Sequence, residues 1–229
     1  MKKILILGGN SDIGIKLIDK LINLNNFQLC VHFNKNFPKK KYAKKIKFIK
    51  KNLHSINEKN VTKNFDKNYD IIINLVGYVS NQSFLNFNLK ETYKTILINS
   101  FAPFLIIRNS LKKMTKKRYG RIINTSSVGV KFGGSSKTFS YSLSKHLNEF
   151  IPSEVKKLYS YNVLYNTLRI GVTDTKFHKK VKNKSIKNRV KMIPVKKMAS
   201  TNDIAEYIIY LIRDNNYVTN EIISITGGE

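Results

Sequence analysis

The chain has 229 residues, of which 41% are hydrophobic, with one cysteine and a formal net charge of +28. This length and composition suit a single globular domain with a sizeable core. No apolar run approaches the roughly 20 residues of a membrane-spanning helix, and no Cys/His cluster has metal-ligand spacing, so neither a membrane protein nor a metal centre is expected. The lone Cys30 excludes an internal disulfide framework. With the lack of a signal-peptide pattern, it predicts a cytoplasmic protein.

The positive charge has two interpretations. Lys and Arg are dense in 35–51, 112–121 and 176–197, and such charge attracts polyanions such as nucleic acid, an acidic carrier protein or a phosphorylated substrate. The chain is also rich in Lys, Asn and Ile together, the composition of an AT-rich coding sequence, and the charges are spread over loops and solvent faces. We interpret most of the charge as compositional, so a nucleic-acid partner is not expected.

Predicted strands alternate with helix-periodic stretches along the whole chain. The strands are expected at 3–8, 28–33, 46–50, 71–75, 121–125, 164–170 and 222–225. The helices are expected at 12–23, 57–65, 89–113, 141–159 and 202–213. This order predicts an α/β fold: a single domain over 1–229 with a Rossmann-type, doubly wound parallel sheet. Its ligand belongs at the carboxyl ends of the strands.

Three segments depart from this regular order. The crossover at 33–46 contains Pro38 and predicts only a stunted helix. Pro152 is expected to bend the helix that begins near Tyr141 or to split it in two. The long polar segment 173–201 is expected to form a mobile substrate flap over the active site.

The first strand candidate ends in a glycine-rich loop, Gly8-Gly9-Asn10-Ser11-Asp12-Ile13-Gly14, and a helix follows. Glycine permits a tight turn and a close approach of the backbone, and a helix N-terminus offers free N–H groups to a pyrophosphate. The loop therefore predicts dinucleotide binding. The alternative is a glycine turn that merely connects a strand to a helix.

Tyr141 and Lys145 are four residues apart at a predicted helix start, so their side chains are expected to be neighbours. An adjacent cation favours phenolate over phenol, which predicts a lowered pKa for Tyr141 and a role as a general acid/base in alcohol–carbonyl chemistry. Tyr and Lys at this spacing also occur by chance in Lys-rich helices. The pair is informative because the same chain has the glycine loop.

Other short motifs follow in order: Asn74-Leu75-Val76-Gly77, Ile98-Asn99-Ser100, Thr125-Ser126-Ser127, Gly171-Val172-Thr173-Asp174-Thr175 and Ile225-Thr226-Gly227-Gly228. With the loop and the Tyr–Lys pair, the chain resembles the short-chain dehydrogenase/reductase family, in its short single-domain branch, over nearly its whole length. The family's loop pattern T-G-x-x-x-G-x-G is matched by Gly8 and Gly14. Leu7 replaces the threonine, and Asp12 replaces the middle glycine.

The resemblance implies a role for each motif. Asn74 would bond between strands, Gly77 would let the adenosine ribose lie close, and Asn99 would hold a proton-relay water. Gly171 and Val172 would flank the nicotinamide, while Thr175 would reach its carboxamide or the diphosphate.

In the implied mechanism, hydride passes between the nicotinamide and a carbonyl carbon. Tyr141 transfers the proton, Ser127 holds the substrate oxygen, and Lys145 lowers the tyrosine pKa and bonds the nicotinamide ribose. Ser127 fits the family better than Ser126, since the family's usual serine-to-tyrosine gap is slightly shorter than even that from Ser127.

The second strand candidate ends in His32-Phe33-Asn34-Lys35, without the carboxylate that NAD preference usually needs. Asn34 and Lys35 are expected to receive a 2′-phosphate, so NADP(H) is favoured over NAD(H). Asn52 and Leu53 are expected beside the adenine.

The sequence thus predicts an NADP(H)-dependent oxidoreductase that interconverts a ketone or aldehyde and an alcohol. One alternative is a 3-oxoacyl-acyl-carrier-protein reductase. Another, from a different class, is a non-catalytic nucleotide-sensing or nucleic-acid-binding protein. By resemblance, a homodimer or homotetramer is expected, formed by the helices near 89–113 and 141–159.

Overall fold

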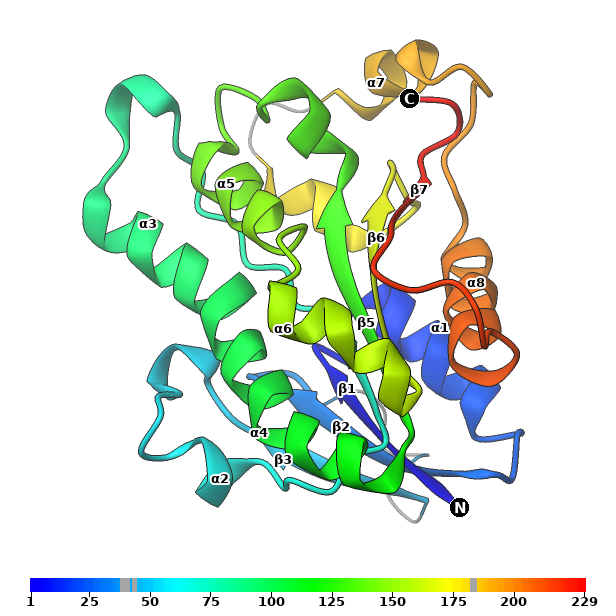
Figure 1. Cartoon of the computed structure of the whole chain (residues 1–229). Coiled ribbons are helices and arrows are strands. Elements are labelled where there is room, and N and C mark those ends of the chain that lie inside the picture. Colours follow the sequence, from blue (N-terminus) through cyan, green and yellow to red (C-terminus); the bar gives the residue numbers. More distant parts are fainter. Residues whose placement is uncertain (38–41, 43–44, 182–184) are drawn as a thin grey trace.

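The computed structural model describes residues 1–37, 42, 45–181 and 185–229 (Figure 1). The expected stunted helix around Pro38 lies largely outside these residues. Among the described residues, no helix is both long and apolar enough to cross a bilayer.

A seven-stranded, wholly parallel sheet forms the centre of the molecule, with strand order β3-β2-β1-β4-β5-β6-β7. Its strands are β1 (Lys2–Leu7), β2 (Phe27–Phe33), β3 (Ile46–Lys50), β4 (Ile71–Asn74), β5 (Gly120–Ser127), β6 (Val163–Ile170) and β7 (Ile222–Ile225). The predicted doubly wound parallel sheet is therefore confirmed, with every predicted strand within two residues of its observed ends.

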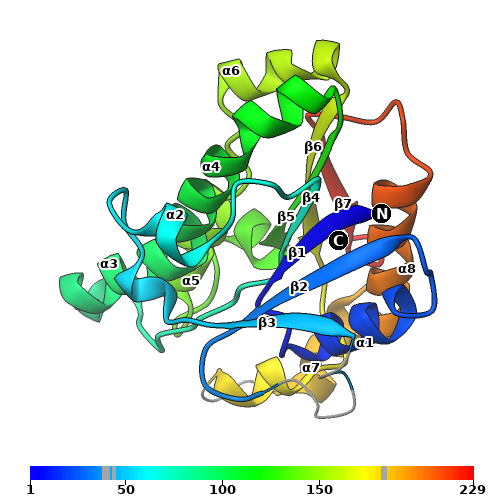
Figure 2. The ribbon, with the colours of Figure 1, turned by 90° about the horizontal axis from the view of Figure 1, so that it is seen from below.

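The apolar strands are covered on both faces (Figure 2). Side chains alternate along a strand, so in β1 Ile4 and Ile6 pack with helices α1 (Asp12–Leu21) and α8 (Thr201–Arg213). Leu5 and Leu7 face the opposite core. That second core lies beneath α4 (Ala102–Lys117). Each fully buried aliphatic side chain contributes about 1.5–3 kcal/mol, which fixes the register of the central strands.

The remaining helical segments are short. They are η2 (Leu53–Ser55), α2 (Val61–Asn64), η3 (Phe84–Asn86), α3 (Leu89–Ile96), η4 (Leu97–Phe101), η5 (Val128–Phe132), α5 (Phe139–Leu147), α6 (Ser153–Lys156), η6 (Lys157–Tyr161), η7 (Lys176–Lys180) and α7 (Ile186–Met192).

Three of these segments differ from the sequence-based expectation. The helix predicted at 57–65 is wrong in length, because the side chains of Asn57 and Asn60 bond nearby backbone groups and leave only one turn, α2. The helix predicted at 89–113 contains a π-helical stretch, η4. The helix predicted at 141–159 is split, with α5 ending at Leu147 and Pro152 capping α6, as the proline predicts.

The chain reverses its direction of travel across the sheet between β1 and β4. It proceeds from β1 outward to β2 and β3, and then returns to place β4 on the other side of β1. Ligands of open α/β sheets bind at such a switch point, outside the carboxyl ends of the strands. The loops after β1, β4, β5 and β6 all reach that end of the sheet.

Candidate active site

The loop after β1 turns sharply at Gly8, whose φ of 72° is left-handed. A Cβ on Gly8 would also lie 3.0 Å from the Leu75 carbonyl atoms, so glycine is needed there. A Cβ on Gly14 would lie 2.7 Å from the Gly9 carbonyl oxygen, so Gly14 lets the loop and α1 pack closely. The Ser11 hydroxyl accepts a hydrogen bond from the Gly14 N–H and caps α1.

His32, which we did not predict from sequence, supports this loop from β2. Its Nδ1 accepts from the Gly8 N–H at 3.3 Å, and its Nε2 donates to the Lys51 carbonyl oxygen at 2.8 Å. This arrangement requires the neutral ring with its proton on Nε2. Burial lowers the pKa of His32 and keeps the ring neutral. No sequence signal separates this histidine from an ordinary buried one.

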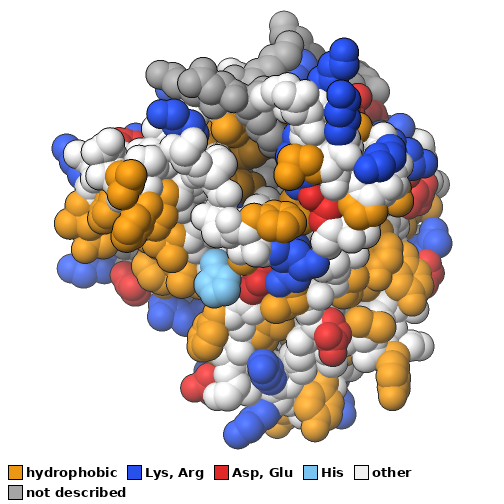
Figure 3. Space-filling model, turned by 90° about the horizontal axis from the view of Figure 1, so that it is seen from above, with side chains coloured by type: hydrophobic (Ala, Val, Ile, Leu, Met, Phe, Trp, Pro, Cys, Tyr) orange, Lys and Arg blue, Asp and Glu red, His pale blue; other side chains and the backbone are white. Residues whose placement is uncertain are grey.

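A cleft of about 1080 Å³ extends from the glycine loop along the carboxyl ends of the strands. Figure 3 looks onto this end of the molecule, where the surface is hollowed among hydrophobic and basic side chains. The predicted cofactor residues at the outer part of the cleft all line it: Asn34, Lys35, Asn52 and Leu53. The Asn52 side-chain oxygen accepts from the His54 N–H, which leaves its amide N–H₂ group as the donor available to a ligand.

Asn74 is the last residue of β4 and Gly77 lies in the loop after it; of the two, only Gly77 lines the cleft. Asn74 is fully buried. Its amide donates to the Asn124 side-chain oxygen at 2.7 Å, which joins β4 to β5. Its side-chain oxygen accepts from the Val76 N–H and so shapes the loop that carries Gly77.

Asn99 lies in the π-helical stretch η4 and is fully buried, away from the cleft wall. Its side-chain oxygen accepts from the Tyr78 N–H at 2.7 Å, and its amide donates to the Ser144 hydroxyl at 2.8 Å. Its backbone carbonyl oxygen accepts from the Asn148 side chain at 3.1 Å. Asn99 therefore ties the loop after β4 to α5, the helix that carries Tyr141.

The two serines at the end of β5 have different partners. The Ser126 hydroxyl donates to Glu149 at 2.7 Å, and Glu149 forms a largely buried ion pair with Arg169. The Ser127 side chain lines the cleft, where its hydroxyl accepts from the Gly129 N–H at 3.2 Å and lies near enough to Tyr141 to lower the pKa of that phenol. Of the two serines, Ser127 is thus the one in contact with the predicted acid/base.

Tyr141 and Lys145 project from α5 into the cleft, with the ammonium nitrogen 6.0 Å from the centroid of the phenol ring. Lys145 is buried. It donates to the Val76 carbonyl oxygen at 2.9 Å, the Thr125 carbonyl oxygen at 3.0 Å and the Thr125 hydroxyl at 3.2 Å. These bonds account for all three ammonium protons.

The expected lowering of the Tyr141 pKa does not occur in this arrangement. Burial raises the pKa of Tyr141 to about 12, and the hydrogen bond with Ser127 offsets this only in part. Burial also lowers the pKa of Lys145 to about 7. Burial thus disfavours the charged form of Lys145, and its protons are directed at oxygens of Val76 and Thr125, so it does little to favour phenolate.

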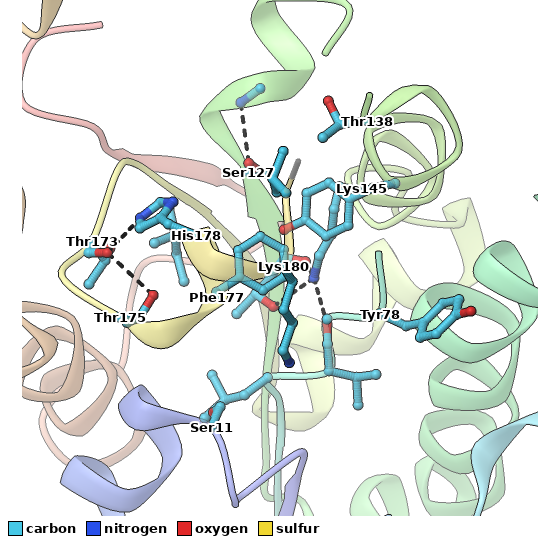
Figure 4. Close-up of a pocket in the computed structure, with 18 of the residues that line it drawn as sticks. Ser11, Tyr78, Ser127, Thr138, Lys145, Thr173, Thr175, Phe177, His178 and Lys180 are labelled. Carbon is cyan, nitrogen blue, oxygen red and sulfur yellow. Dashed lines mark hydrogen bonds between the residues drawn. The ribbon is translucent and has the colours of Figure 1, made fainter. Parts of the chain in front are cut away.

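The loop after β6 forms the opposite wall of the cleft, and Gly171, Val172 and Thr175 all line it. A Cβ on Gly171 would lie 2.8 Å from the Thr226 Cα, so glycine lets the loop pack against the end of β7. The chain then crosses the cleft as a segment that we call the strap, residues 175–181. Figure 4 shows two strap side chains, Phe177 and Lys180, among the residues that line the cleft together with Lys145.

The residues of this cleft fit a nicotinamide dinucleotide. Two loops, at Gly8 and Gly77, present bare backbone on either side of the switch point, and the capped N-terminus of α1 lies between them. A lysine lies at each end of the cleft, Lys35 at the outer end and the buried Lys145 at the inner end. A parallel doubly wound sheet with this serine–tyrosine–lysine group defines the class of nucleotide-binding α/β oxidoreductases.

Comparison with known proteins places the chain within that class. Residues 55–229 match a family model described as enoyl-(acyl carrier protein) reductase. A 3-oxoacyl-acyl-carrier-protein reductase of Aquifex aeolicus is 33% identical over 82% of this chain and 78% of its own length. A 3α-hydroxysteroid dehydrogenase of Mediterraneibacter gnavus is 31% identical over 69% of this chain and 64% of its own length.

Solved structures share the fold. ElxO with NADP bound superposes with a TM-score of 0.82 at 23% identity, covering 99% of this chain and 98% of that one. A short chain dehydrogenase family protein from Francisella tularensis has a TM-score of 0.79 at 22% identity, covering 100% and 98%. The chain belongs to the short-chain dehydrogenase/reductase family. The predicted family, the predicted fold and the prediction of an NAD(P)-dependent oxidoreductase are confirmed.

Proposed function

We propose that the protein reduces a ketone or aldehyde with NADPH, and that Ser127, Tyr141 and Lys145 carry the reaction. The observation that supports this most directly is their convergence: β5 supplies Ser127, α5 supplies the other two, and all three line the cleft that begins at the glycine loop. A non-catalytic nucleotide sensor or nucleic-acid binder has no use for this arrangement.

The protein's own groups serve proton transfer and positioning. When bound, the cofactor supplies the hydride to the carbonyl carbon. Ser127 holds the carbonyl oxygen, and Tyr141 donates its phenolic proton to that oxygen as negative charge develops on it. Because the pKa of Tyr141 is raised to about 12, the phenol is protonated at neutral pH, which suits the reductive direction. Lys145 lies one helical turn from Tyr141 and donates to oxygens of Val76 and Thr125, and a bound nicotinamide ribose would take over one of these hydrogen bonds.

NADP(H) specificity would depend on the end of β2. Lys35 and Asn34 are exposed and line the outer cleft, and among the described residues of the cleft lining no carboxylate lies beside them. A 2′-phosphate there gains an ammonium partner, whereas NAD(H) finds no acidic residue for its ribose hydroxyls.

The test is oxidation of NADPH against a panel of ketones and aldehydes, with Tyr141→Phe beside the native protein. Loss of a general acid costs about two to four orders of magnitude in rate, while NADPH binding by the variant should persist. If turnover is unchanged in Tyr141→Phe, the assignment is wrong.

A 3-oxoacyl thioester is the second candidate substrate. The Aquifex relative is named for that activity. The described lining of the cleft beyond Tyr141 also includes three cationic side chains, Lys137, Lys180 and Arg189. The carboxylate in the described lining is Asp12, and it lies at the opposite end, in the glycine loop. Cations at the mouth would suit a phosphate-bearing acyl carrier. Turnover of an acetoacetyl thioester well above that of simple ketones would favour this candidate.

We propose that 173–201 covers bound substrate, since Val181, Asn188, Arg189 and Met192 of this segment line the inner cleft. We also propose a cytoplasmic location, which the free, buried Cys30 suits.

A homo-oligomer is proposed from an apolar stripe on α3 and η4. Leu89, Tyr93 and Phe101 are exposed and line one shallow depression together with Leu97. Such a patch marks an interaction surface, and it lies within the helical region at 89–113 expected to self-associate. Light scattering should show the native oligomer dissociating in Tyr93→Lys. The matched control is Tyr217→Lys. Tyr217 is also an exposed tyrosine but lies outside this depression, so the oligomer should stay intact in that variant.

A further inference from the structure

The strap is fastened on both sides of the cleft. Near its beginning, the Lys176 N–H donates to the Asp12 carboxylate at 2.7 Å, which ties the strap to the first turn of α1. Near its end, the Lys180 carbonyl oxygen accepts from the Asn81 side chain at 2.9 Å, which ties it to the loop after β4. Asp12 is the residue that stands where the family's loop pattern has its middle glycine.

Between these two ties, the Phe177 ring lies inside the cleft. Its centroid is 5.2 Å from that of the Tyr141 ring, and its edge is 3.5 Å from the position of a Cβ on Gly77. The Lys180 ammonium lies 5.9 Å from the ring on the strap's own side. A ligand that extends from the glycine loop to Tyr141 must therefore displace Phe177.

We propose that Asp12 and Phe177 form a latch that holds the nucleotide cleft closed, and that an arriving diphosphate opens it. The inference rests on the proposed NADP(H)-dependent function. Asp12 keeps Phe177 in place through Lys176, and Phe177 blocks the half of the cleft that contains Tyr141.

Competition at one helix terminus is the physical basis for opening. The N-terminus of α1 favours a negative group, and Asp12 is that group while the strap is closed. A diphosphate binds best at the N–H groups of this same helix terminus, and two anions at one terminus repel each other. The Asp12 carboxylate then moves away from the helix terminus, and its hydrogen bond with the Lys176 N–H breaks. The strap, with Phe177, can then move away from Tyr141.

A latch of this kind weakens apparent affinity, because only the open fraction binds the whole cofactor. A hydrogen bond to a carboxylate together with one ring contact corresponds to an open fraction of roughly a thirtieth. Phe177→Ala should therefore bind NADPH about 5- to 30-fold more tightly than the native chain, and Asp12→Asn should also bind it more tightly. Phe84→Ala and Asp214→Asn, which change exposed residues away from the cleft, are the matched controls and should leave affinity unchanged.

Binding can be followed by NADPH fluorescence, since the chain contains no tryptophan to interfere. Adenosine 2′,5′-bisphosphate is the comparison ligand because it lacks the nicotinamide half. Phe177→Ala should leave its affinity within about twofold. If Asp12 acts through the strap, the effects of Asp12→Asn and Phe177→Ala on NADPH binding are less than additive in the double variant. Full additivity, or unchanged NADPH affinity in Phe177→Ala, overturns the latch.

A second readout needs no cofactor. In the ligand-free protein, hydrogen exchange of the peptide that contains the Lys176 amide should be faster in Asp12→Ala than in the native chain or in Asp214→Ala. Equal exchange rates overturn the latch even if NADPH binds. If neither NADPH nor the bisphosphate binds any variant while the exchange difference is present, the proposed function fails and the latch between Asp12 and the strap stands.

Discussion

The buried Lys145 should make the stability of the ligand-free protein depend on pH in an unusual window. Its side chain is 3% exposed, and desolvation lowers its pKa from 10.5 to about 7. Because the folded pKa is the lower one, the folded state carries the full cost of a buried cation below about pH 7. That cost fades as the pH rises toward the unfolded value, since the folded state releases the proton first.

The size of the effect follows from the two pKa values. A shift of this size corresponds to at most about 5 kcal/mol of differential interaction, at 1.36 kcal/mol per pKa unit. Between pH 7 and pH 9, linkage gives a gain of about 2 kcal/mol in the free energy of unfolding.

The assay is urea denaturation of the native chain and of Lys145→Met at several pH values from 6 to 9. The other lysines titrate alike in both proteins, so the difference between them isolates this one group. We expect the native chain to gain about 2 kcal/mol relative to the variant between pH 7 and pH 9. A difference that stays constant with pH would refute the burial of a titrating lysine at this position.

Three further predictions concern residues around the cleft. The pKa of His32 is lowered by burial, so the unfolding free energy should fall as the pH drops below about 6.5, and in His32→Gln denaturation curves this fall should be absent. Because the Ser126 hydroxyl donates to the buried Glu149 carboxylate, Ser126→Ala should cost about 1–2 kcal/mol of stability in urea with turnover retained. Ser127→Ala should instead lose turnover with little change in stability. If Ser126→Ala loses turnover and Ser127→Ala loses stability, Ser126 is the catalytic serine and Ser127 the structural one. Lys35→Glu should reduce the ratio of NADPH to NADH affinity at least about tenfold, as measured by titration with each cofactor, and an unchanged ratio would remove Lys35 from the 2′-phosphate site.

Much of the cleft could be predicted from local pattern. A glycine turn between a strand and a helix, and a Tyr–Lys pair one helical turn apart, depend on residues close in sequence, so local pattern is enough to predict that Gly8, Tyr141 and Lys145 line the cleft. The choice of Ser127 over Ser126 was a prediction from spacing. The structure adds a physical reason, because Glu149 and Arg169 engage Ser126 from outside the cleft.

The sequence by itself determined the order of strands and helices, the crevice at the switch point and which loops border it, because apolar periodicity and glycine turns act over a few residues. Tertiary structure alone decided the protonation of the site and the position of the strap. Desolvation depends on all the atoms packed around a group, many of them distant in sequence. It raises the pKa of Tyr141 and lowers that of Lys145, whereas the spacing of the pair alone predicts a charged lysine and a lowered tyrosine pKa. The tie from Asp12 to Lys176 joins residues 164 positions apart, and no local pattern encodes a contact at that distance.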